Sequence, residues 1–229
     1  MERHLLLLAA AWTLYFLLHS LLASLQVKRR VARRWPRAVP AYRLLYNALA
    51  LLLLIPPLYL TYTAPGDYLW RWEGPAWWLS NALALLALAG FFWTGRHYDL
   101  GEFIGLRQWR SHEQRVEDQE RLHLSPLHHY VRHPWYSLGL VLIWTREMTP
   151  GLLLAALLAT LYLFAGSRLE ERKLLIYHGE HYRRYQDRVP GLIPRPWRRL
   201  PPDRAAAPGR AGTLHGKPSS NRQNGRCQN

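Results

Sequence analysis

The chain has 229 residues, of which 49% are hydrophobic, and it carries 30 Lys and Arg against 15 Asp and Glu, a formal net charge of +15. Residues 5–25 form an apolar stretch in which His19 is the only side chain able to carry a charge near neutral pH. A helix that is apolar on every side over this length is typical of a membrane span, which excludes a plain water-soluble domain. The single cysteine, Cys227, excludes an intrachain disulfide framework and a multi-cysteine zinc site.

Apolar stretches follow one another along the chain: 5–25, 44–62, 76–93, 136–144 and 152–166. A bilayer core needs about 20 helical residues, so the first three stretches can cross it and the last two qualify only as a hairpin with its turn at 148–151. Pro56 and Pro57 interrupt the second stretch and are expected to kink it. We therefore predict an all-α integral membrane protein with about five transmembrane helices, three followed by a C-terminal helical hairpin, and a cytoplasmic C-terminal helix at 169–188.

Basic residues indicate the orientation of these spans. Residues 26–43 contain seven Lys and Arg and no acid, whereas Arg71 is the only basic residue in 63–75, and the segment after the third span is again rich in Arg. The positive-inside rule then places the N-terminus outside and the C-terminus in the cytoplasm. The first span has a weakly charged start and an apolar run longer than the ~7–15 residues of a signal peptide, so we interpret it as a retained helix.

Polar side chains gather where the last two apolar stretches are expected to meet the cytoplasm. They form three groups: residues 128–136, the pair Glu170-Glu171, and residues 178–185. Adjacent carboxylates at the edge of a membrane suit a cation, and a cofactor with an ammonium or a sulfonium group would qualify. The faces of Tyr136 and Tyr182 could add cation–π attraction.

Simpler interpretations remain open for these residues. Glu170 and Glu171 have basic neighbours and could belong to a solvated charge run, and Arg132 could be a positive-inside anchor. The histidines of the first group lack a matching carboxylate or second histidine pair at a recognisable spacing, so we expect no metal site. We expect His19 to be a hydrogen-bonded interhelical residue. The basic tail, 195–229, is expected to be disordered or to contact anionic lipid, not nucleic acid.

Short motifs in the last part of the chain carry a family resemblance: Val131-Arg132-His133-Pro134-Trp135-Tyr136, Glu170-Glu171, His178-Gly179-Glu180-His181-Tyr182 with Tyr185, Val189-Pro190, and Leu192-Ile193-Pro194. In order and spacing they resemble the isoprenylcysteine carboxyl methyltransferase superfamily. The resemblance implies that the final hairpin and the helix after it bind S-adenosylmethionine on the cytoplasmic side, with a lipophilic substrate entering from the membrane. The implied cofactor site comprises His133, Pro134 and Tyr136, Glu170 facing the amino group of the cofactor, and His128, Arg132, Glu171, His178 and Tyr182.

A narrower resemblance covers more of the chain. His19-Ser20, Tyr98-Asp99-Leu100 and residues 103–108 are similar to the bacterial methanethiol S-methyltransferase branch, which makes dimethyl sulfide from methanethiol. This implies an enzyme of the bacterial inner membrane with a small-molecule thiol as substrate. We accordingly divide the chain into three regions: N-terminal membrane spans in 1–95, a cofactor-binding methyltransferase region with the hairpin in 96–194, and the tail in 195–229.

Two positions depart from the superfamily pattern. His128 stands where the family usually has a tyrosine, which weakens the expected stacking or hydrogen-bonding role at that position. Gly166 stands where the prenylcysteine branch has an arginine that holds the substrate carboxylate. A carboxylate substrate would lose its charge-assisted partner here, so a small neutral thiol fits better than a carboxyl acceptor.

The expected reaction is direct displacement, in which a thiol or thiolate takes the methyl group of a sulfonium. Since the thiolate is the nucleophile, a base could assist, and the candidates are Asp99, His128 and His178. Arg107 and Gln108 are predicted to line the substrate end of the site. The alternatives are a carboxyl or lipid methyltransferase, an NADPH-dependent membrane reductase and a non-catalytic membrane protein, and the oligomeric state is left open.

Overall fold

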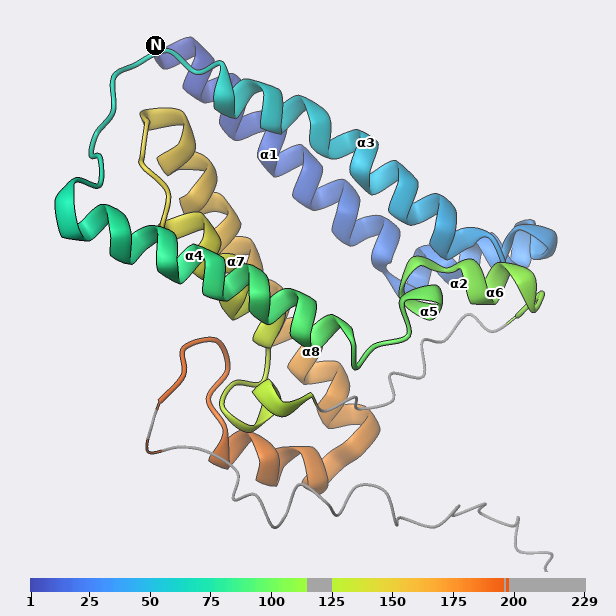
Figure 1. Ribbon diagram of the computed structural model, residues 1–229. Coiled ribbons are helices and arrows are strands. Elements are labelled where there is room, and N and C mark those ends of the chain that lie inside the picture. The colour runs from blue at the N-terminus through green and yellow to red at the C-terminus, as the bar shows by residue number, and fades with distance from the viewer. Residues whose placement is uncertain (115–124, 196, 198–229) are drawn as a thin grey trace, which may run out of the picture.

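The computed structural model describes residues 1–114, 125–195 and 197, and the regular secondary structure of this part is helical (Figure 1). An isolated antiparallel bridge between Trp70 and Met148 accompanies the helices. Their bounds are α1 Glu2–Ala23, α2 Leu25–Arg34, η1 Pro36–Ala38, α3 Tyr42–Tyr62, α4 Gly74–Gly95, α5 Leu100–Ile104, α6 Leu106–Arg110, η2 Pro126–His129, α7 Pro134–Trp144 and α8 Pro150–Arg188.

The larger helices pack as two groups that meet at the α7–α8 connection. Helices α1, α3 and α8 contact one another, and α4 packs along α7. Leu8 and Trp12 of α1 form a buried apolar cluster with Ala155 of α8. The indole Nε1 of Trp12 donates a hydrogen bond to Thr61 Oγ1 of α3 over 3.0 Å. The N-terminal half of α1 is therefore held against both α3 and α8.

His19 lies where α1, α3 and α8 meet. Its Nδ1 lies 2.8 Å from the Tyr162 hydroxyl of α8, and its Nε2 lies 2.8 Å from the Tyr46 hydroxyl of α3. Ser20 Oγ lies 3.0 Å from the same Tyr162 hydroxyl. Both ring nitrogens are thus engaged between helices, which spares the apolar bundle an unpaired polar group. The interpretation of His19 as a hydrogen-bonded interhelical residue is confirmed.

Helices α1, α3, α4 and α8 are long and apolar enough to cross a membrane. Large apolar side chains along them, such as Leu51 and Leu85, are exposed on the protein surface, which is expected where that surface faces lipid tails. The stretches predicted at 5–25, 44–62 and 76–93 correspond to α1, α3 and α4. The helix α3 continues through both internal prolines.

The C-terminal hairpin differs from its prediction in the length of its helices. The first, α7, is apolar but has 11 residues, and the second stretch is the start of a 39-residue helix, α8. The apolar part of α8 ends near Gly166, and the charged part beyond it is the C-terminal helix predicted at 169–188. This helix bends at Gly179, whose φ of 52° lies in the left-handed region that glycine adopts readily.

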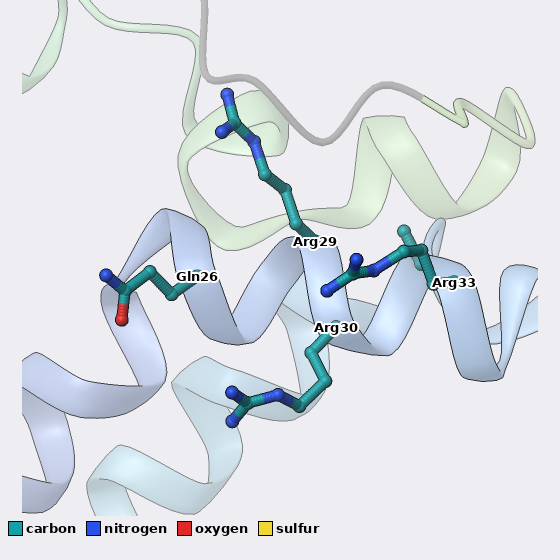
Figure 2. A pocket seen from close by; sticks show the side chains of 5 residues that line it. Gln26, Arg29, Arg30 and Arg33 are labelled. Carbon is teal, nitrogen blue, oxygen red and sulfur yellow. The ribbon is translucent and has the colours of Figure 1, made fainter.

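Helix α2 follows α1 after a break at Ser24, whose extended backbone and side-chain cap begin the new helix. Figure 2 shows Gln26, Arg29, Arg30 and Arg33 of α2 around an open pocket. A basic helix directly after a membrane span suits the headgroup layer of the cytoplasmic side. The tail predicted at 195–229 lies outside the described residues, apart from Arg195 and Trp197.

Gly151 lies where the start of α8 passes the end of α3. A β-carbon added to Gly151 would lie 2.4 Å from the Ala64 β-carbon and 3.0 Å from the Thr61 backbone oxygen. We predict that Gly151→Ala lowers the free energy of unfolding by about 1–3 kcal/mol, because these neighbours cannot yield without a backbone shift. Thermal unfolding of the purified protein in detergent measures this change.

Gly139→Ala is the matched control, because no atom lies within 4 Å of its added β-carbon. Its unfolding midpoint should stay the same or rise slightly, since alanine is the better helix former. Equal midpoints for the two variants would contradict the close approach of α3 and α8.

Candidate functional site

The start of α7 is joined to the C-terminal segment that follows α8. The Arg132 backbone N–H donates to the Pro190 carbonyl over 2.8 Å, and the His133 N–H donates to the Gly191 carbonyl over 3.2 Å. His133 is the residue before α7, and Pro134 is its first residue, a position where the missing N–H of proline costs nothing. The motifs at 131–136 and 189–194, far apart in the sequence, are thus neighbours in the fold.

A buried ion pair crosses this junction. Arg132 donates from Nε to Glu171 Oε1 over 2.8 Å, and its Nη2 lies 2.7 Å from the same oxygen. Its Nη1 donates to the backbone oxygens of Gln186 and Val189. The amide of Gln186 donates to the other Glu171 oxygen, Oε2, over 3.0 Å. Arg132 therefore holds α7, α8 and the C-terminal segment together, which is more than a positive-inside anchor requires.

The imidazole of His133 lies between the two adjacent glutamates of α8. Its Nε2 is 3.1 Å from Glu171 Oε1, and its Nδ1 is 3.4 Å from Glu170 Oε2. Burial by itself would lower the pKa of His133, but the bonds to Glu170 and Glu171 outweigh it and hold the pKa above its ordinary value. The ring stacks on Tyr136, with centroids 5.4 Å apart and planes inclined by 9°. Two carboxylates and one aromatic ring thus fix the position of the His133 imidazole.

The two glutamates have different surroundings, although they are adjacent in the sequence. Burial would raise the pKa of Glu171, but its bonds to His133 and Arg132 hold the pKa below its ordinary value, and its side chain is 7% exposed. Glu170 contacts His133 and keeps 38% of its side chain exposed. The Glu171 carboxylate is therefore occupied by Arg132 and His133, whereas the Glu170 carboxylate remains accessible to a ligand.

His128 lies beside this cluster in a neutral form. Its Nδ1 accepts a hydrogen bond from the Ser125 backbone N–H over 3.0 Å, and its carbonyl accepts one from the Tyr185 hydroxyl over 2.7 Å. Burial, followed by the charge of His133, lowers the pKa of His128 to about 4. The ring is therefore uncharged at neutral pH and is a weak proton acceptor.

Tyr182 and His178 lie on the bent end of α8. Tyr182 is almost fully buried with Leu174, Tyr185 and Val189, and burial raises the pKa of its hydroxyl. The half-buried His178 has an Nε2 atom with no hydrogen-bond partner among the described residues. Tyr182 thus packs under the site, and His178 retains an unused ring nitrogen.

The predicted substrate residues form a second, more exposed group on α5 and α6. Arg107 Nη1 donates to Asp99 Oδ2 and to Glu102 Oε2, each over 3.1 Å. A backbone hydrogen bond from Glu102, followed by the bond to Arg107, lowers the pKa of Asp99, which makes it a weak base. Gln108 donates to the Glu102 carbonyl over 3.1 Å, and its Oε1 is buried without a partner in the described part of the chain.

Aromatic packing connects this second group to the first. Tyr98 and Phe103 pack on Trp135 of α7, with ring centroids 5.1 Å and 5.3 Å away. Burial and then the charge of Glu170 raise the pKa of the Tyr98 hydroxyl, which places Tyr98 close to that carboxylate. The motif beginning at Tyr98 therefore borders the cluster through aromatic side chains and not through Asp99 or Arg107.

No group of three or more His, Cys, Asp and Glu side chains in the described ranges could hold a metal ion.

Comparison with known proteins identifies the family. The chain is 32% identical to Methanethiol S-methyltransferase 2 of Bradyrhizobium diazoefficiens over 213 residues, which cover 86% of this chain and 75% of the relative. It is 32% identical to the methanethiol S-methyltransferase of Mycobacterium tuberculosis over 199 residues, 76% of this chain and 73% of the relative. The chain belongs to the methanethiol S-methyltransferase family. No family model and no solved structure matches it.

The share of a relative's length that this chain covers differs between family members. Methanethiol S-methyltransferase 1 of Bradyrhizobium diazoefficiens is 34% identical over 186 residues, and the chain spans 62% of that relative. The narrower of the two predicted resemblances is confirmed by these relatives. Gln186 is one residue of the cluster that sequence reasoning missed. In a straight helix it would lie about 22 Å from Glu171, and only the bend at Gly179 brings the two side chains together.

Glu171→Gln tests whether the ion pair stabilises the fold. Removing one partner of a buried charge pair leaves Arg132 unpaired, so we predict a loss of about 3 kcal/mol in the free energy of unfolding near neutral pH. Because the pKa of Glu171 is lowered by folding, its contribution is present above its ordinary pKa of 4.5 and is lost as the pH falls below it. The variant should therefore show a smaller loss of stability on acidification.

The unfolding midpoint, followed from about pH 3 to about pH 8, measures both effects. The raised pKa of His133 adds stability below its ordinary value of 6.5, which is lost as the pH rises through the folded value. Glu180→Gln is the control, because Glu180 is exposed and its ion pair in the described part of the chain is with the exposed Arg183. An acid-side slope equal to that of the unaltered protein would contradict a structural role for Glu171.

Proposed function

We propose that this protein is an integral membrane methyltransferase that transfers the methyl group of S-adenosylmethionine to methanethiol. Its family membership supports the reaction and the acceptor, because the relatives are named methanethiol S-methyltransferases. The single structural observation that supports the cofactor is the accessible Glu170 carboxylate beside the buried His133, whose ring stacks on the half-buried Tyr136. This arrangement suits a cationic ligand at the junction of α7 and α8.

The residues that would hold the cofactor follow from their charges. S-adenosylmethionine supplies a methyl group on a positively charged sulfur and carries an ammonium group. Glu170 would bind the ammonium group by a charge-assisted hydrogen bond. Tyr136 would offer its ring face to positive charge, and His133 would be kept in place by Glu171. Pro134, His128, Arg132, His178 and Tyr182 remain predicted members of the site. We propose that Arg132 and Tyr182 support it through their packing and hydrogen bonds within the protein.

The acceptor thiol reacts as its thiolate, and the residues here differ in how they could help to form it. Asp99 and His128 remain predicted candidates for the base. Each is unprotonated near neutral pH, but each has a lowered pKa that makes it a weak proton acceptor. His178, with its unpartnered Nε2, is the remaining candidate. We propose that alignment of the two sulfur atoms and exclusion of water contribute more than proton removal.

The acceptor is proposed to be small and uncharged. Gly166 has no side chain that could bind a carboxylate, whereas the prenylcysteine branch has an arginine at this position. Arg107 pairs with Asp99 and Glu102 through its Nη1, so its predicted role at the substrate end would use the other donors of the guanidinium. The oligomeric state is not part of this proposal.

The proposed location is the bacterial inner membrane, with the N-terminus outside and the C-terminus in the cytoplasm. The basic α2 and the polar end of α8 lie toward the same end of the bundle (Figure 1). Under the positive-inside rule this end faces the cytoplasm, where S-adenosylmethionine is available. The volatile thiol could reach the same end through the bilayer.

Purified protein in detergent, supplied with S-adenosylmethionine and methanethiol, is expected to release dimethyl sulfide, measured by gas chromatography of the headspace. Prenylcysteine analogues should not be methylated, because no side chain at position 166 holds their carboxylate. Release of methylated prenylcysteine without dimethyl sulfide would favour carboxyl methylation. Calorimetric binding of NADPH, without binding of S-adenosylmethionine, would favour a reductase, and binding of neither would favour a non-catalytic protein.

Glu170→Gln tests the proposed ammonium contact. We predict that the variant binds S-adenosylmethionine about tenfold more weakly by calorimetry, because a charged hydrogen-bond acceptor becomes a neutral one. Its thermal unfolding midpoint should change little, since Glu170 is partly exposed. Glu180→Gln, on the same helix, should leave the affinity unaltered. An unchanged affinity in Glu170→Gln would remove Glu170 from the cofactor site.

A further inference from the structure

A second pocket lies at the end of the bundle opposite the candidate cofactor site. It has a volume of about 400 Å³ and is lined by the end of α3, the loop before α4, the start of α4 and the α7–α8 turn. This size is within the range of pockets that bind small molecules. The lining residues are Thr61, Tyr62, Ala64, Tyr68, Trp72, Trp77, Ser80, Asn81, Thr145, Arg146, Glu147, Thr149 and Leu152.

Backbone hydrogen bonds fix the two walls of this pocket to each other. The Leu69 N–H donates to the Met148 carbonyl over 2.7 Å, and the Met148 N–H donates to the Trp70 carbonyl over 3.2 Å. Met148 is fully buried. The loop between α3 and α4 is therefore attached to the α7–α8 turn, and the pocket is part of the folded structure. It lies where the α1–α3–α8 group and the α4–α7 group meet.

Some polar side chains of the pocket already donate hydrogen bonds to backbone carbonyls, whereas its charged side chains are available to a ligand. Thr61 donates to the Pro57 carbonyl, Thr145 donates to the Val141 carbonyl, and Asn81 donates to the Trp77 carbonyl. Arg146 and Glu147, in contrast, take part in no ion pair within the described ranges. The turn thus presents one cation and one anion, on consecutive residues, to whatever occupies the pocket.

The surroundings of these charges are aromatic and lie at one end of the helices that are long and apolar enough to cross a membrane. Tyr62, Tyr68, Trp72 and Trp77 line the pocket, and such amphipathic rings favour the headgroup layer. Directly beside the pocket, Trp78 and Leu79 are 71% and 63% exposed, respectively. Exposed apolar surface next to a charged, aromatic pocket suits a molecule with a polar headgroup and apolar chains.

We propose that this pocket binds the headgroup of a zwitterionic phospholipid with a primary ammonium group, that is, a phosphatidylethanolamine. The Arg146 guanidinium would bind the phosphate, which its planar donors match. The Glu147 carboxylate would bind the ammonium group, and the aromatic rings would add cation–π attraction. The acyl chains would lie on the exposed apolar surface beside Trp78. The lipid would then bridge the two helix groups at the end of the bundle away from the cofactor.

Native mass spectrometry of the delipidated full-length protein in detergent tests this site. Phosphatidylethanolamine is expected to bind as one retained lipid, about tenfold more tightly than phosphatidylglycerol with the same chains, which lacks the ammonium group. Arg146→Gln and Glu147→Gln should each weaken phosphatidylethanolamine binding about tenfold. The lipid should also raise the thermal unfolding midpoint of the unaltered protein and not that of the two variants.

Arg3→Gln is the control, because Arg3 is exposed and does not line the pocket. Its affinity for phosphatidylethanolamine should equal that of the unaltered protein. Equal binding of phosphatidylglycerol, or unaltered binding in Arg146→Gln and Glu147→Gln, would overturn the proposal. Displacement of the lipid by an equal concentration of soluble phosphoethanolamine would also overturn it, because the pocket would then bind a water-soluble ligand.

Discussion

The buried ion pair between Arg132 and Glu171 is the interaction on which the candidate site depends. It joins Arg132, two residues before α7, to the polar end of α8, and the remaining donors of Arg132 reach backbone oxygens at the end of α8 and just after it. Two charges removed from water carry a desolvation penalty, so this pair is weak evidence for added stability in itself. Its consequence is positional, because three segments that are distant in the sequence are brought to one place.

This constraint explains why two adjacent glutamates can have separate roles. Glu171 is surrounded by Arg132, His133 and Gln186 and has little capacity left for a ligand. Glu170 remains partly exposed and touches the opposite nitrogen of the same imidazole. The Glu170 carboxylate is held by His133 on one side and is accessible on the other, which suits a cationic ligand that must enter and leave the site. Because the His133 ring contacts both carboxylates, the position of Glu171 also fixes the ring nitrogen that Glu170 contacts.

Much of the fold could be predicted from hydropathy and charge. The stretches that became α1, α3 and α4 are apolar for long enough to identify them as helices. The charged helix at 169–188 was expected to continue the last apolar stretch, and both belong to α8, but the bend at Gly179 was not predicted. The described residues contain four helices long and apolar enough to cross a membrane and the shorter apolar α7, in line with the prediction of three long helices followed by a hairpin.

The site could be predicted in part, because motif spacing identifies residue types and not their partners. Arg132, His133 and Glu171 were candidates, and the family resemblance assigned the cofactor's amino group to Glu170, but the partners that surround Glu171 could not be predicted. Asp99 remains a predicted base, and the structure adds its position at the start of α5 and its contact with Arg107. Such local pairs depend on how a loop folds over a few residues, and a single sequence does not record that.

The central claim is that the junction of α7 and α8 binds S-adenosylmethionine. Photo-crosslinking of the purified protein with S-adenosylmethionine radiolabelled in its adenosine part, followed by peptide mapping, tests it most directly. The label is predicted in peptides that contain residues 128–136 or 167–185, and excess unlabelled S-adenosylmethionine should prevent its incorporation. Specific labelling confined to peptides of α1–α4, or incorporation that unlabelled S-adenosylmethionine does not reduce, would contradict the account.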